Sequence, residues 1–271
     1  MDSPIPAFVI NLADAQDRRS RIMAMLSRYE ELSADVVPAV DGRHVSADAF
    51  AGLVAAPRVL FRHCREHSLT GGETACALSH LRSLRRVVER DIPAALVLED
   101  DVLLRDGFGR IVGSAAAFLH SLSGPAVVLL SARTKVYGPV RWRYNDGAIR
   151  SAFGGVGAYA YLVNRSGATR LLERTLPLVA PFDHWHCHAR NGIRLYSFLP
   201  HPASFMGKGD DSAIREQRTE KWRKEESWRR EDGRLRWWMA QLLDGSRIRW
   251  SLLKHFRDGI ETAKEWPDGI L

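Results

Sequence analysis

Short apolar runs alternate along the chain with stretches whose apolar positions recur at helical spacing. A continuous apolar run is typical of a strand that is buried on both faces of a sheet, and the helical spacing is typical of helices that cover such a sheet. The runs that predict strands lie at residues 6–12, 36–40, 92–98, 126–130, 158–163 and 194–199. This alternation predicts an α/β fold with a mostly parallel central sheet.

The clearest predicted helix begins after Thr70. Thr70 is a favourable N-cap residue, and Glu73 three residues later completes a capping box. The buried stripe of this helix is predicted at Ala77, Leu81, Leu84 and Val88. Ser79 and His80 are polar residues on the same helix, which leads directly into the strand at 92–98. A lone histidine in such a place is more often a hydrogen-bonded structural residue than a catalyst.

Three further helices and a hairpin are predicted from local signals. The helices are expected after Asp14 as the cap, with Ile22, Met25 and Leu26 buried; at 107–122; and from Asn164 or Ser166 to the residues before Pro177. Residues 135–150 alternate aromatic and basic side chains around the turn sequence Asn145-Asp146-Gly147, which is typical of a hairpin. The glycines at 154–157 precede the strand at 158–163 and would allow a close approach of the backbone. Residues 43–69 are less regular and predict a short helix and a loop.

Three consecutive carboxylates, Glu99, Asp100 and Asp101, end the buried run at 92–98. In open α/β sheets, ligands bind at the carboxyl ends of the strands. Three carboxylates at such a place repel one another unless a cation lies between them, although acidic runs are also common in solvated turns. Hard oxygen ligands suit Mg²⁺ or Mn²⁺, and such ions usually accompany a phosphorylated substrate. The triplet is therefore the first candidate for a functional site.

The composition is that of a soluble globular protein, with 45% hydrophobic and 26% charged residues among 271. No apolar run approaches the roughly 20 residues that span a bilayer, and the charged segment at 17–21 argues against an export signal. Cys64, Cys76 and Cys187 are an odd number of cysteines without metal-type pairing, which favours a reducing cytoplasm. No glycine-rich phosphate loop is present, so the sequence lends no support to an ATPase or a dehydrogenase.

The net charge of +7 is concentrated near the C-terminus, where residues 215–257 hold thirteen Lys and Arg against seven Asp and Glu. Six of the eight tryptophans also lie beyond residue 215. We therefore divide the chain into a catalytic domain at 1–213 and a basic, tryptophan-rich helical tail at 214–271. The apolar stripe of the tail is expected at Leu235, Trp238, Met239, Leu242, Leu253, Phe256 and Ile260.

The composition of the tail fits more than one partner. Basic residues with tryptophans suit an anionic membrane surface, and a helix that packs on the catalytic domain is an equal alternative. A protein that binds nucleic acid through this tail is a weaker possibility, because it leaves the acidic triplet unexplained. We expect no nucleic-acid partner.

A second cluster of possible ligands, residues 184–188, contains three histidines and a cysteine. Histidines at a spacing of two share a face only in a strand, whereas Pro181 followed by Asp183 predicts a helix start that would scatter them. Zinc sites also generally need a second ligand group at motif spacing, and none is obvious. The sequence therefore gives little support to zinc at this cluster.

Several of these segments, in this order, resemble glycosyltransferase family 25, the lipopolysaccharide and lipooligosaccharide sugar transferases that are related to the collagen galactosyltransferases. The most specific block is LTGGETACALSH at 69–80 followed by ALVLEDDV at 95–102. Residues 8–12 with Arg18 and Arg19, and residues 38–42, also resemble the family. Weaker matches lie at 157–163, 181–183 and 211–214.

The resemblance implies a GT-A-like nucleotide-sugar-binding fold and a UDP-sugar donor, most often UDP-galactose. It further implies Mn²⁺ or Mg²⁺ at the acidic strand end and inversion at the anomeric carbon. The acceptor would be a glycan or a lipid-linked glycan in the assembly of lipopolysaccharide or another surface polysaccharide. Such an enzyme would be cytoplasmic, with peripheral contact to the inner face of the membrane. A non-catalytic membrane-surface scaffold on the same fold is the main alternative, because a fold does not guarantee a reaction.

On this basis we assign roles to individual residues. Asp101 is expected to coordinate the metal, with Asp100 and His201 as further ligands. The expected donor contacts are Asn11, Arg18, Arg19, Ser79, His80, Glu99 and Asp100. Inverting transfer is a single displacement that needs a general base for the acceptor hydroxyl, and Asp183 is the candidate. Glu73 and His80 are the alternatives for that base.

Overall fold

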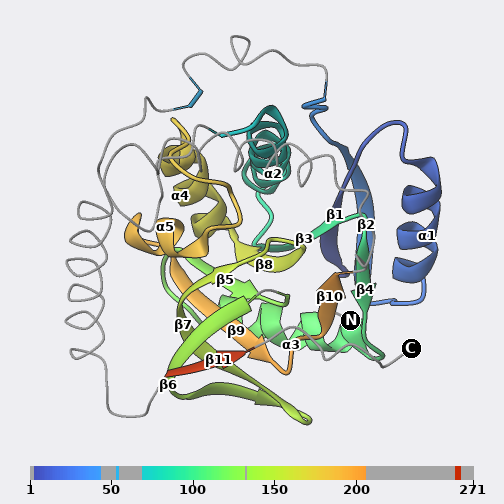
Figure 1. Cartoon of the computed structure of the whole chain (residues 1–271). Coiled ribbons are helices and arrows are strands. Elements are labelled where there is room, and N and C mark those ends of the chain that lie inside the picture. Colours follow the sequence, from blue (N-terminus) through green and yellow to red (C-terminus); the bar gives the residue numbers. More distant parts are fainter. Residues whose placement is uncertain (1–2, 44–52, 55–68, 132, 206–259, 264–271) are drawn as a thin grey trace, which may run out of the picture.

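The computed structural model describes residues 3–43, 53–54, 69–131, 133–205 and 260–263 (Figure 1). Its main strands are β1 (Ile5–Asn11), β2 (Leu32–Pro38), β3 (Ala94–Glu99), β5 (Ala126–Leu129), β6 (Arg133–Tyr144), β7 (Gly147–Val156), β8 (Ala160–Asn164), β9 (Arg194–Leu199) and β11 (Ile260–Ala263). They form one nine-stranded sheet in the order β11-β6-β7-β9-β5-β8-β3-β1-β2. Two short strands, β4 (Val102–Leu104) and β10 (Ala203–Phe205), form a separate antiparallel pair.

Most strands of the large sheet share one direction. Strands β1, β2, β3, β5, β6 and β9 run one way, and β7, β8 and β11 run the other way. The fold is therefore α/β, and most strands of its central sheet run in the same direction, as the apolar runs predicted. Antiparallel neighbours nevertheless outnumber parallel ones among the described strands, because β8 lies between β3 and β5 and the β6–β7 hairpin extends the sheet.

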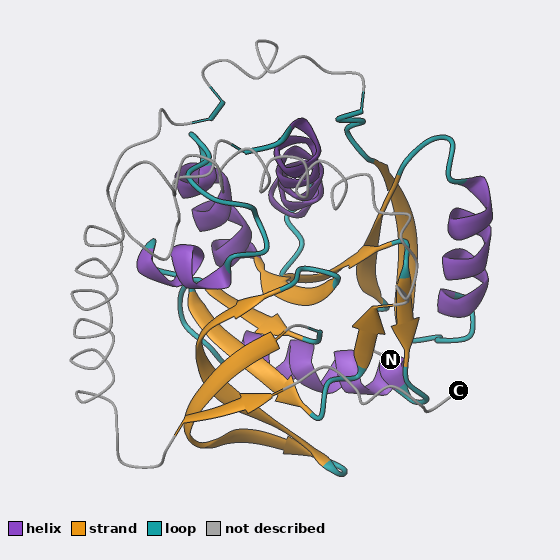
Figure 2. Cartoon of the chain, in the orientation of Figure 1, coloured by secondary structure: helices purple, strands orange, loops and turns teal. Residues whose placement is uncertain are grey.

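Helices cover both faces of the sheet (Figure 2). Helices α1 (Gln16–Leu26) and α3 (Phe108–His120) pack into one apolar core, and α2 (Gly71–Glu89), α4 (Arg165–Thr175) and α5 (Trp185–Arg190) pack into the other. Alternate residues of β3 divide between the two cores, with Leu96 and Leu98 on the α3 side and Ala95 and Val97 on the α2 side. The period of two predicts that Glu99, two residues after Val97, faces the α2 side.

Two of the predicted helix starts are confirmed. Thr70 caps α2, and its side chain and that of Glu73 form both hydrogen bonds of the capping box. Asn164 caps α4 by accepting a hydrogen bond from the Gly167 backbone N–H at 2.8 Å. These caps were predictable because each cap residue and its partner are three residues apart in sequence. Their hydrogen bonds therefore do not depend on tertiary contacts.

The predicted cap at Asp14 is wrong. Helix α1 begins one residue further on, with Ala15 at the N-cap and no side-chain cap hydrogen bond. The carboxylate of Asp14 instead forms an ion pair of 2.7 Å with Arg43 in the segment after β2. A contact between residues so far apart in sequence competes with the local cap and is invisible to a local pattern.

The predicted hairpin is confirmed, since β6 and β7 are antiparallel neighbours joined at Asn145 and Asp146. Asn145 has φ of 49°, a value that Asn tolerates better than most residues. The glycine-rich segment was predicted to precede the next strand, but Gly154 and Gly155 belong to β7. A Cβ on Gly154 would lie 2.9 Å from the Cβ of His186, so the expected close approach occurs, here against α5.

The C-terminal part differs from expectation where it is described. Strand β9 was predicted to be the last, yet β10 and β11 follow it. Ile260, assigned to a helical stripe, begins β11, which pairs with β6 in antiparallel register. The remainder of the predicted tail helix lies outside the described residues, as do most of the irregular segment at 43–69 and the weak match at 211–214. Within the described ranges, no helix is long and apolar enough to cross a bilayer.

Candidate functional site

The carboxyl ends of β1 and β3 meet at one edge of the sheet. The two strands are parallel neighbours with Ile10 opposite Glu99, so Asn11 and Asp100 follow at the same level. The Asn11 amide donates a 2.6 Å hydrogen bond to Asp100 Oδ2 and a 3.0 Å bond to the Ala15 carbonyl. Both side chains are buried, at 3% and 8% exposed. This network fixes the turn after β3 against the start of α1.

Two arginines of α1 bind the same turn. Arg18 Nε lies 3.3 Å from Asp100 Oδ2, and Arg21 donates a 3.0 Å hydrogen bond to the Asp100 backbone carbonyl. Arg18 remains 42% exposed, so its guanidinium reaches both the carboxylate and solvent. Arg19 is exposed, and no hydrogen bond or ion pair joins its side chain to the described residues of the turn. Arg21, which the sequence did not single out, thus joins Arg18 in contact with Asp100, and the expected donor contact of Arg19 stays a prediction.

Asp101 is the residue of the acidic triplet whose carboxyl has a strongly raised pKa. Burial raises the pKa of its carboxyl from 3.8 to about 7, and the neighbouring charges of Glu99 and Asp100 add to the effect, which Arg18 partly offsets. Its buried Oδ1 atom has no hydrogen-bond partner among the described residues. An orphaned, buried carboxylate oxygen beside two other carboxylates fits the hard oxygen ligation that Mg²⁺ or Mn²⁺ prefers.

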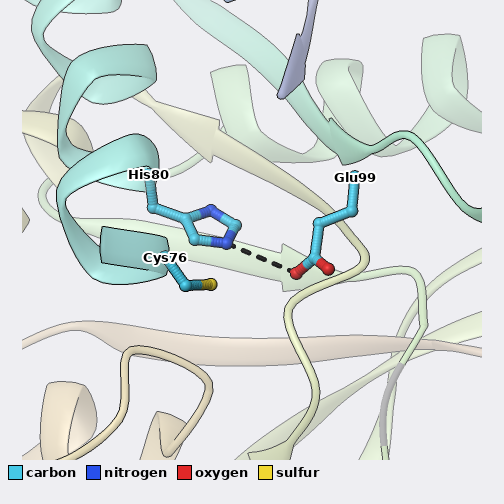
Figure 3. A group of neighbouring side chains, drawn as sticks. All are labelled: Cys76, His80 and Glu99. Carbon is cyan, nitrogen blue, oxygen red and sulfur yellow. Dashed lines mark ion pairs between the residues drawn. The ribbon is translucent and has the colours of Figure 1, made fainter. Parts of the chain in front are cut away.

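Glu99 points away from this turn and toward α2, as the strand period predicted. Its Oε1 atom lies 3.4 Å from His80 Nε2 (Figure 3). Cys76, one helical turn before His80, completes the group, and one ligand-type atom from each of the three residues lies within 4.8 Å of the others. The cysteine was not expected here, because the sequence pattern gave it no partner.

His80 is fully buried in an aromatic setting. Its ring stacks on Phe182 with 4.4 Å between ring centroids and 2° between planes, and its Nδ1 atom is hydrogen-bonded to the Tyr161 hydroxyl at 3.2 Å. Burial lowers the pKa of His80 to about 3, although the carboxylate of Asp183 acts in the opposite direction. The imidazole is therefore neutral at physiological pH.

Asp183 is brought to the same region by the turn before α5. It follows Phe182, the ring that stacks on His80, and its charge acts on His80. Asp183 Oδ1 lies 4.0 Å from His184 Nε2. This aspartate oxygen is buried and has no hydrogen-bond partner within the described ranges. A carboxylate oxygen that is not used in the protein's own hydrogen bonds is a chemically suitable proton acceptor.

Other expected site residues have contacts within the protein. The Ser79 hydroxyl donates to the Ala75 carbonyl at 2.7 Å and accepts from the Val40 N–H at 2.8 Å, so it ties α2 to the segment after β2. His201 is 2% exposed, with Nε2 3.5 Å from Thr134 Oγ1. It is not in the ligand group formed by Cys76, His80 and Glu99, and no described group of three ligands unites it with Asp101. Its role as a metal ligand stays a prediction.

The histidine cluster at 184–188 does not form a described group of three ligands. His186 and His188 lie on helix α5 with His184 at its N-cap, so the helix that the proline and aspartate signals predicted is present. The predicted scattering is only partial, because the rings of His184 and His186 lie 5.5 Å apart between centroids. His188 points inward and its Nε2 is hydrogen-bonded to the Phe182 carbonyl at 2.8 Å, while burial lowers its pKa to about 4. This histidine therefore supports the loop that carries Asp183.

Comparisons with known proteins match these segments. The family model of glycosyltransferase family 25 (LPS biosynthesis protein) covers residues 5–186. A glycosyltransferase 25 family member from Aedes aegypti is 27% identical over 183 residues, 66% of this chain and 30% of that protein. Human procollagen galactosyltransferase 2 is 35% identical over 103 residues, 37% of this chain and 16% of that protein. A mouse protein named inactive glycosyltransferase 25 family member 3 is 39% identical over 105 residues, 38% of this chain and 17% of that protein.

The chain therefore spans less than a third of the length of each of these relatives. Among solved structures, a mannose-1-phosphate geranyltransferase from Thermus thermophilus aligns over 74% of this chain and 76% of that chain at 12% identity. Its TM-score is 0.35, which is too low to bear on fold or activity. The family match, in contrast, runs from β1 to the start of α5 and contains Asn11, the acidic turn and Asp183. The chain belongs to glycosyltransferase family 25.

Proposed function

We propose that this protein is a metal-dependent, inverting glycosyltransferase that moves a sugar from a UDP-sugar to a hydroxyl of a glycan or lipid-linked glycan. The observation that carries the proposal is the acidic turn at the adjoining ends of β1 and β3, where Asn11 and Arg18 hold Asp100 beside the strained Asp101. Family membership supports transfer of a sugar, and the name of the human relative favours galactose.

The donor would bind across the two strand ends. Arg18 is half-exposed beside the turn and has further N–H groups beyond Nε with which to bind a diphosphate. Asn11 would act as a positioning residue, because its amide is already committed to Asp100 and Ala15. Donor contacts from Ser79, His80 and Glu99 stay predictions, since these residues make contacts inside the protein.

Asp101 and Asp100 would hold the divalent cation. Their carboxylate oxygens are the ligand type that Mn²⁺ and Mg²⁺ prefer, and the orphaned Oδ1 of Asp101 offers a coordination position. A bound cation would neutralise the charge that develops on the departing diphosphate. In its absence, the same carboxylates would repel an anionic donor, so donor binding and metal binding should be coupled.

Asp183 would act as the general base. The acceptor oxygen attacks the anomeric carbon as its proton passes to an Asp183 oxygen, while the bond from that carbon to the UDP oxygen breaks and its electron pair leaves with UDP. Attack from the side opposite the leaving group inverts the anomeric configuration. The neutral His80 and the packed Phe182 would hold the loop of Asp183 in place and exclude water.

A second candidate is a non-catalytic member on the same fold. This is favoured by the match to proteins whose names describe them as inactive. Asp101 and Asp183 argue against it, because each has a buried oxygen without a hydrogen-bond partner among the described residues, and a buried carboxylate without a ligand or substrate destabilises the fold. Contact of the tail with an anionic membrane, the cytoplasmic location and a role in surface polysaccharide assembly remain proposals that rest on the sequence.

The decisive experiment is release of UDP from a panel of UDP-sugars with Mn²⁺, with Mg²⁺ and with EDTA. We expect slow hydrolysis of one donor, lost on addition of EDTA and in the Asp101→Asn variant. Turnover that persists in both conditions would overturn the metal assignment. Failure of the protein to bind UDP in the presence of Mn²⁺ would overturn the transferase proposal, whereas binding without turnover of any donor would support the non-catalytic candidate.

A further inference from the structure

Cys76, His80 and Glu99 bring a thiol, an imidazole nitrogen and a carboxylate together between α2 and the end of β3 (Figure 3). Figure 3 shows the cysteine and histidine side chains extending from α2 toward the glutamate at the end of β3. We propose that these three residues bind a zinc-class transition-metal ion, at a site separate from the divalent cation expected at Asp101. The inference does not depend on the proposed transferase activity.

The fold explains why the three side chains converge. Cys76 and His80 are four residues apart on α2, a spacing that places two side chains on one helix face, one above the other. Glu99 follows Val97 on the face of β3 that packs against α2. A helix face with ligands four residues apart, opposite a carboxylate from a neighbouring strand, brings a thiol, an imidazole and a carboxylate to one point.

His80 Nε2 is a buried polar atom whose surroundings favour a bound cation. This atom belongs to a side chain that is 0% exposed, and it has no hydrogen-bond partner among the described residues. The Glu99 oxygen lies 3.4 Å away but outside hydrogen-bond geometry. A buried polar atom without a hydrogen-bond partner lowers the stability of the fold by roughly 1–3 kcal/mol. A ligand at this atom would remove that cost. A cation between this nitrogen and the carboxylate would give Nε2 the partner that it lacks among the described residues.

The surroundings of His80 are those of a metal ligand. Histidines that bind metals almost always use their second ring nitrogen in a hydrogen bond, which sets the tautomer and the ring orientation. Here Nδ1 is hydrogen-bonded to the Tyr161 hydroxyl at 3.2 Å. The stack on Phe182 holds the ring plane from one side. With Nδ1 protonated toward Tyr161, the lone pair of Nε2 faces Cys76 and Glu99.

The ligand set selects the class of ion. A thiolate and an imidazole with one carboxylate suit Zn²⁺, whereas Mg²⁺ and Mn²⁺ prefer oxygen ligands throughout. Three protein ligands leave a fourth position of a tetrahedral site for water or another group. Glu99 is 26% exposed, so an ion has a route in from solvent. The two neighbouring sites would therefore differ in ion preference, with zinc at Cys76 and a harder cation at Asp101.

A zinc ion here would connect α2 to the end of β3 and hold Glu99 away from the acidic turn. It would replace the donor contacts that the sequence led us to expect of His80 and Glu99. Binding should release a proton, because the Cys76 thiol must become a thiolate. Cobalt(II) is the probe of choice, since it replaces zinc and its bond to thiolate sulfur gives a charge-transfer absorption that needs neither donor nor activity.

The first test compares two variants of the full chain on titration with cobalt chloride. The double variant C64S/C187S keeps Cys76 as its sole cysteine, and we expect it to show the thiolate charge-transfer band at a stoichiometry of about one. The Cys76→Ser variant keeps the other two cysteines and should lack the band. Absence of the band in the double variant, or its persistence in Cys76→Ser, would overturn the proposal.

The second test uses conservative changes that do not depend on removing the cysteine. In the C64S/C187S background, Tyr161→Phe should weaken cobalt affinity by about 10–100-fold, the usual effect of losing an outer hydrogen bond to a ligand. Glu99→Gln should weaken affinity by more than this, whereas Asp101→Asn should leave the band in place. Equal affinity in Glu99→Gln and its parent, or loss of the band in Asp101→Asn, would contradict a separate site. Zinc should also raise the melting temperature of the parent but not of Cys76→Ser.

Discussion

The side-chain amide of Asn11 donates a 2.6 Å hydrogen bond to the Asp100 carboxylate, and this bond joins the carboxyl ends of two parallel strands. Asp100 thereby becomes a fixed part of the fold, since Arg18 and Arg21 bind its carboxylate and its backbone carbonyl. Asp101 is the next residue, so its position depends on this network. The strained carboxylate at the centre of the proposed site is thus held by the first strand and first helix of the chain.

Replacing Asn11 with Ala should separate the two strand ends. The free energy of unfolding should fall by about 1.5–3 kcal/mol, the usual worth of a buried hydrogen bond to a charged group. The affinity for UDP in the presence of Mn²⁺ should fall by about tenfold or more, because Asp100 would no longer be held in place. A tenfold loss corresponds to about 1.4 kcal/mol of binding free energy. Denaturant unfolding and calorimetric titration measure the two effects.

The matched control for Asn11→Ala lies on α1. Ser20→Ala removes an exposed side chain from the same helix that carries Arg18. Surface changes of this kind usually alter stability by less than about 0.5 kcal/mol, and UDP binding should stay unchanged. If Ser20→Ala impaired UDP binding as strongly as Asn11→Ala, the effect of Asn11→Ala could not be assigned to its bond with Asp100.

Asp101→Asn should stabilise the metal-free protein at neutral pH and remove metal-dependent turnover. The pKa of Asp101 is raised from 3.8 to about 7, so the folded state prefers the protonated form. The penalty for the charged carboxylate is absent below pH 3.8, grows as pH rises to 7 and is constant above it. Since one pKa unit is about 1.4 kcal/mol, the variant should gain up to about 4 kcal/mol at pH 8 and nothing at pH 3.

Urea unfolding of both proteins in EDTA at pH 3, 6 and 8 measures this difference. A gain that grows between the first and last pH values supports a strained Asp101. A variant that is less stable than the parent at pH 8 would mean that the carboxylate is stabilised there by contacts within the fold.

The strand-end site was partly predictable from sequence, for a physical reason. The apolar runs at 6–12 and 92–98 predict parallel strands, whose carboxyl ends lie at one edge of the sheet, so Asn11 and Asp100 were both expected at that edge. Their direct contact was not predicted, because it requires β1 and β3 to be neighbours in the sheet. The convergence of Cys76 and Glu99 could not be predicted from local patterns, because it depends on how α2 packs on the sheet. The cap at Asp14 failed for a related reason, since Arg43, distant in sequence, binds its carboxylate.

Asp183→Asn should separate binding from chemistry. If Asp183 is the general base, sugar transfer should fall by about 10²–10⁴-fold while UDP and Mn²⁺ bind as in the parent. Glu173→Gln on α4 is a suitable control, because this carboxylate is exposed and its ion pair with Arg170 is long, at 3.8 Å. A parallel loss of binding and transfer in Asp183→Asn would assign the residue a structural role in the loop before α5.

The protein should lose stability in mild acid through His188. Burial lowers the pKa of this group from 6.5 to about 4, so its stabilising contribution is complete above pH 6.5 and is lost as pH falls toward 4. His188→Gln should reduce the loss between pH 6.5 and 4 by up to about 3 kcal/mol. His120→Gln on α3 is the matched control, because this side chain is exposed and its replacement should alter the free energy of unfolding by less than about 0.5 kcal/mol.

Two glycines should respond in opposite ways to replacement by alanine. A Cβ on Gly167 in α4 would lie 2.7 Å from the backbone carbonyl oxygen of Ala126, which cannot move without disturbing β5. Overpacking of this kind costs about 1–3 kcal/mol. A Cβ on Gly113 in α3 would meet nothing within 4 Å, so Gly113→Ala should gain up to about 1 kcal/mol from helix propensity. Melting temperatures measured in parallel should move in opposite directions, and a stable Gly167→Ala would show that α4 can shift away from β5.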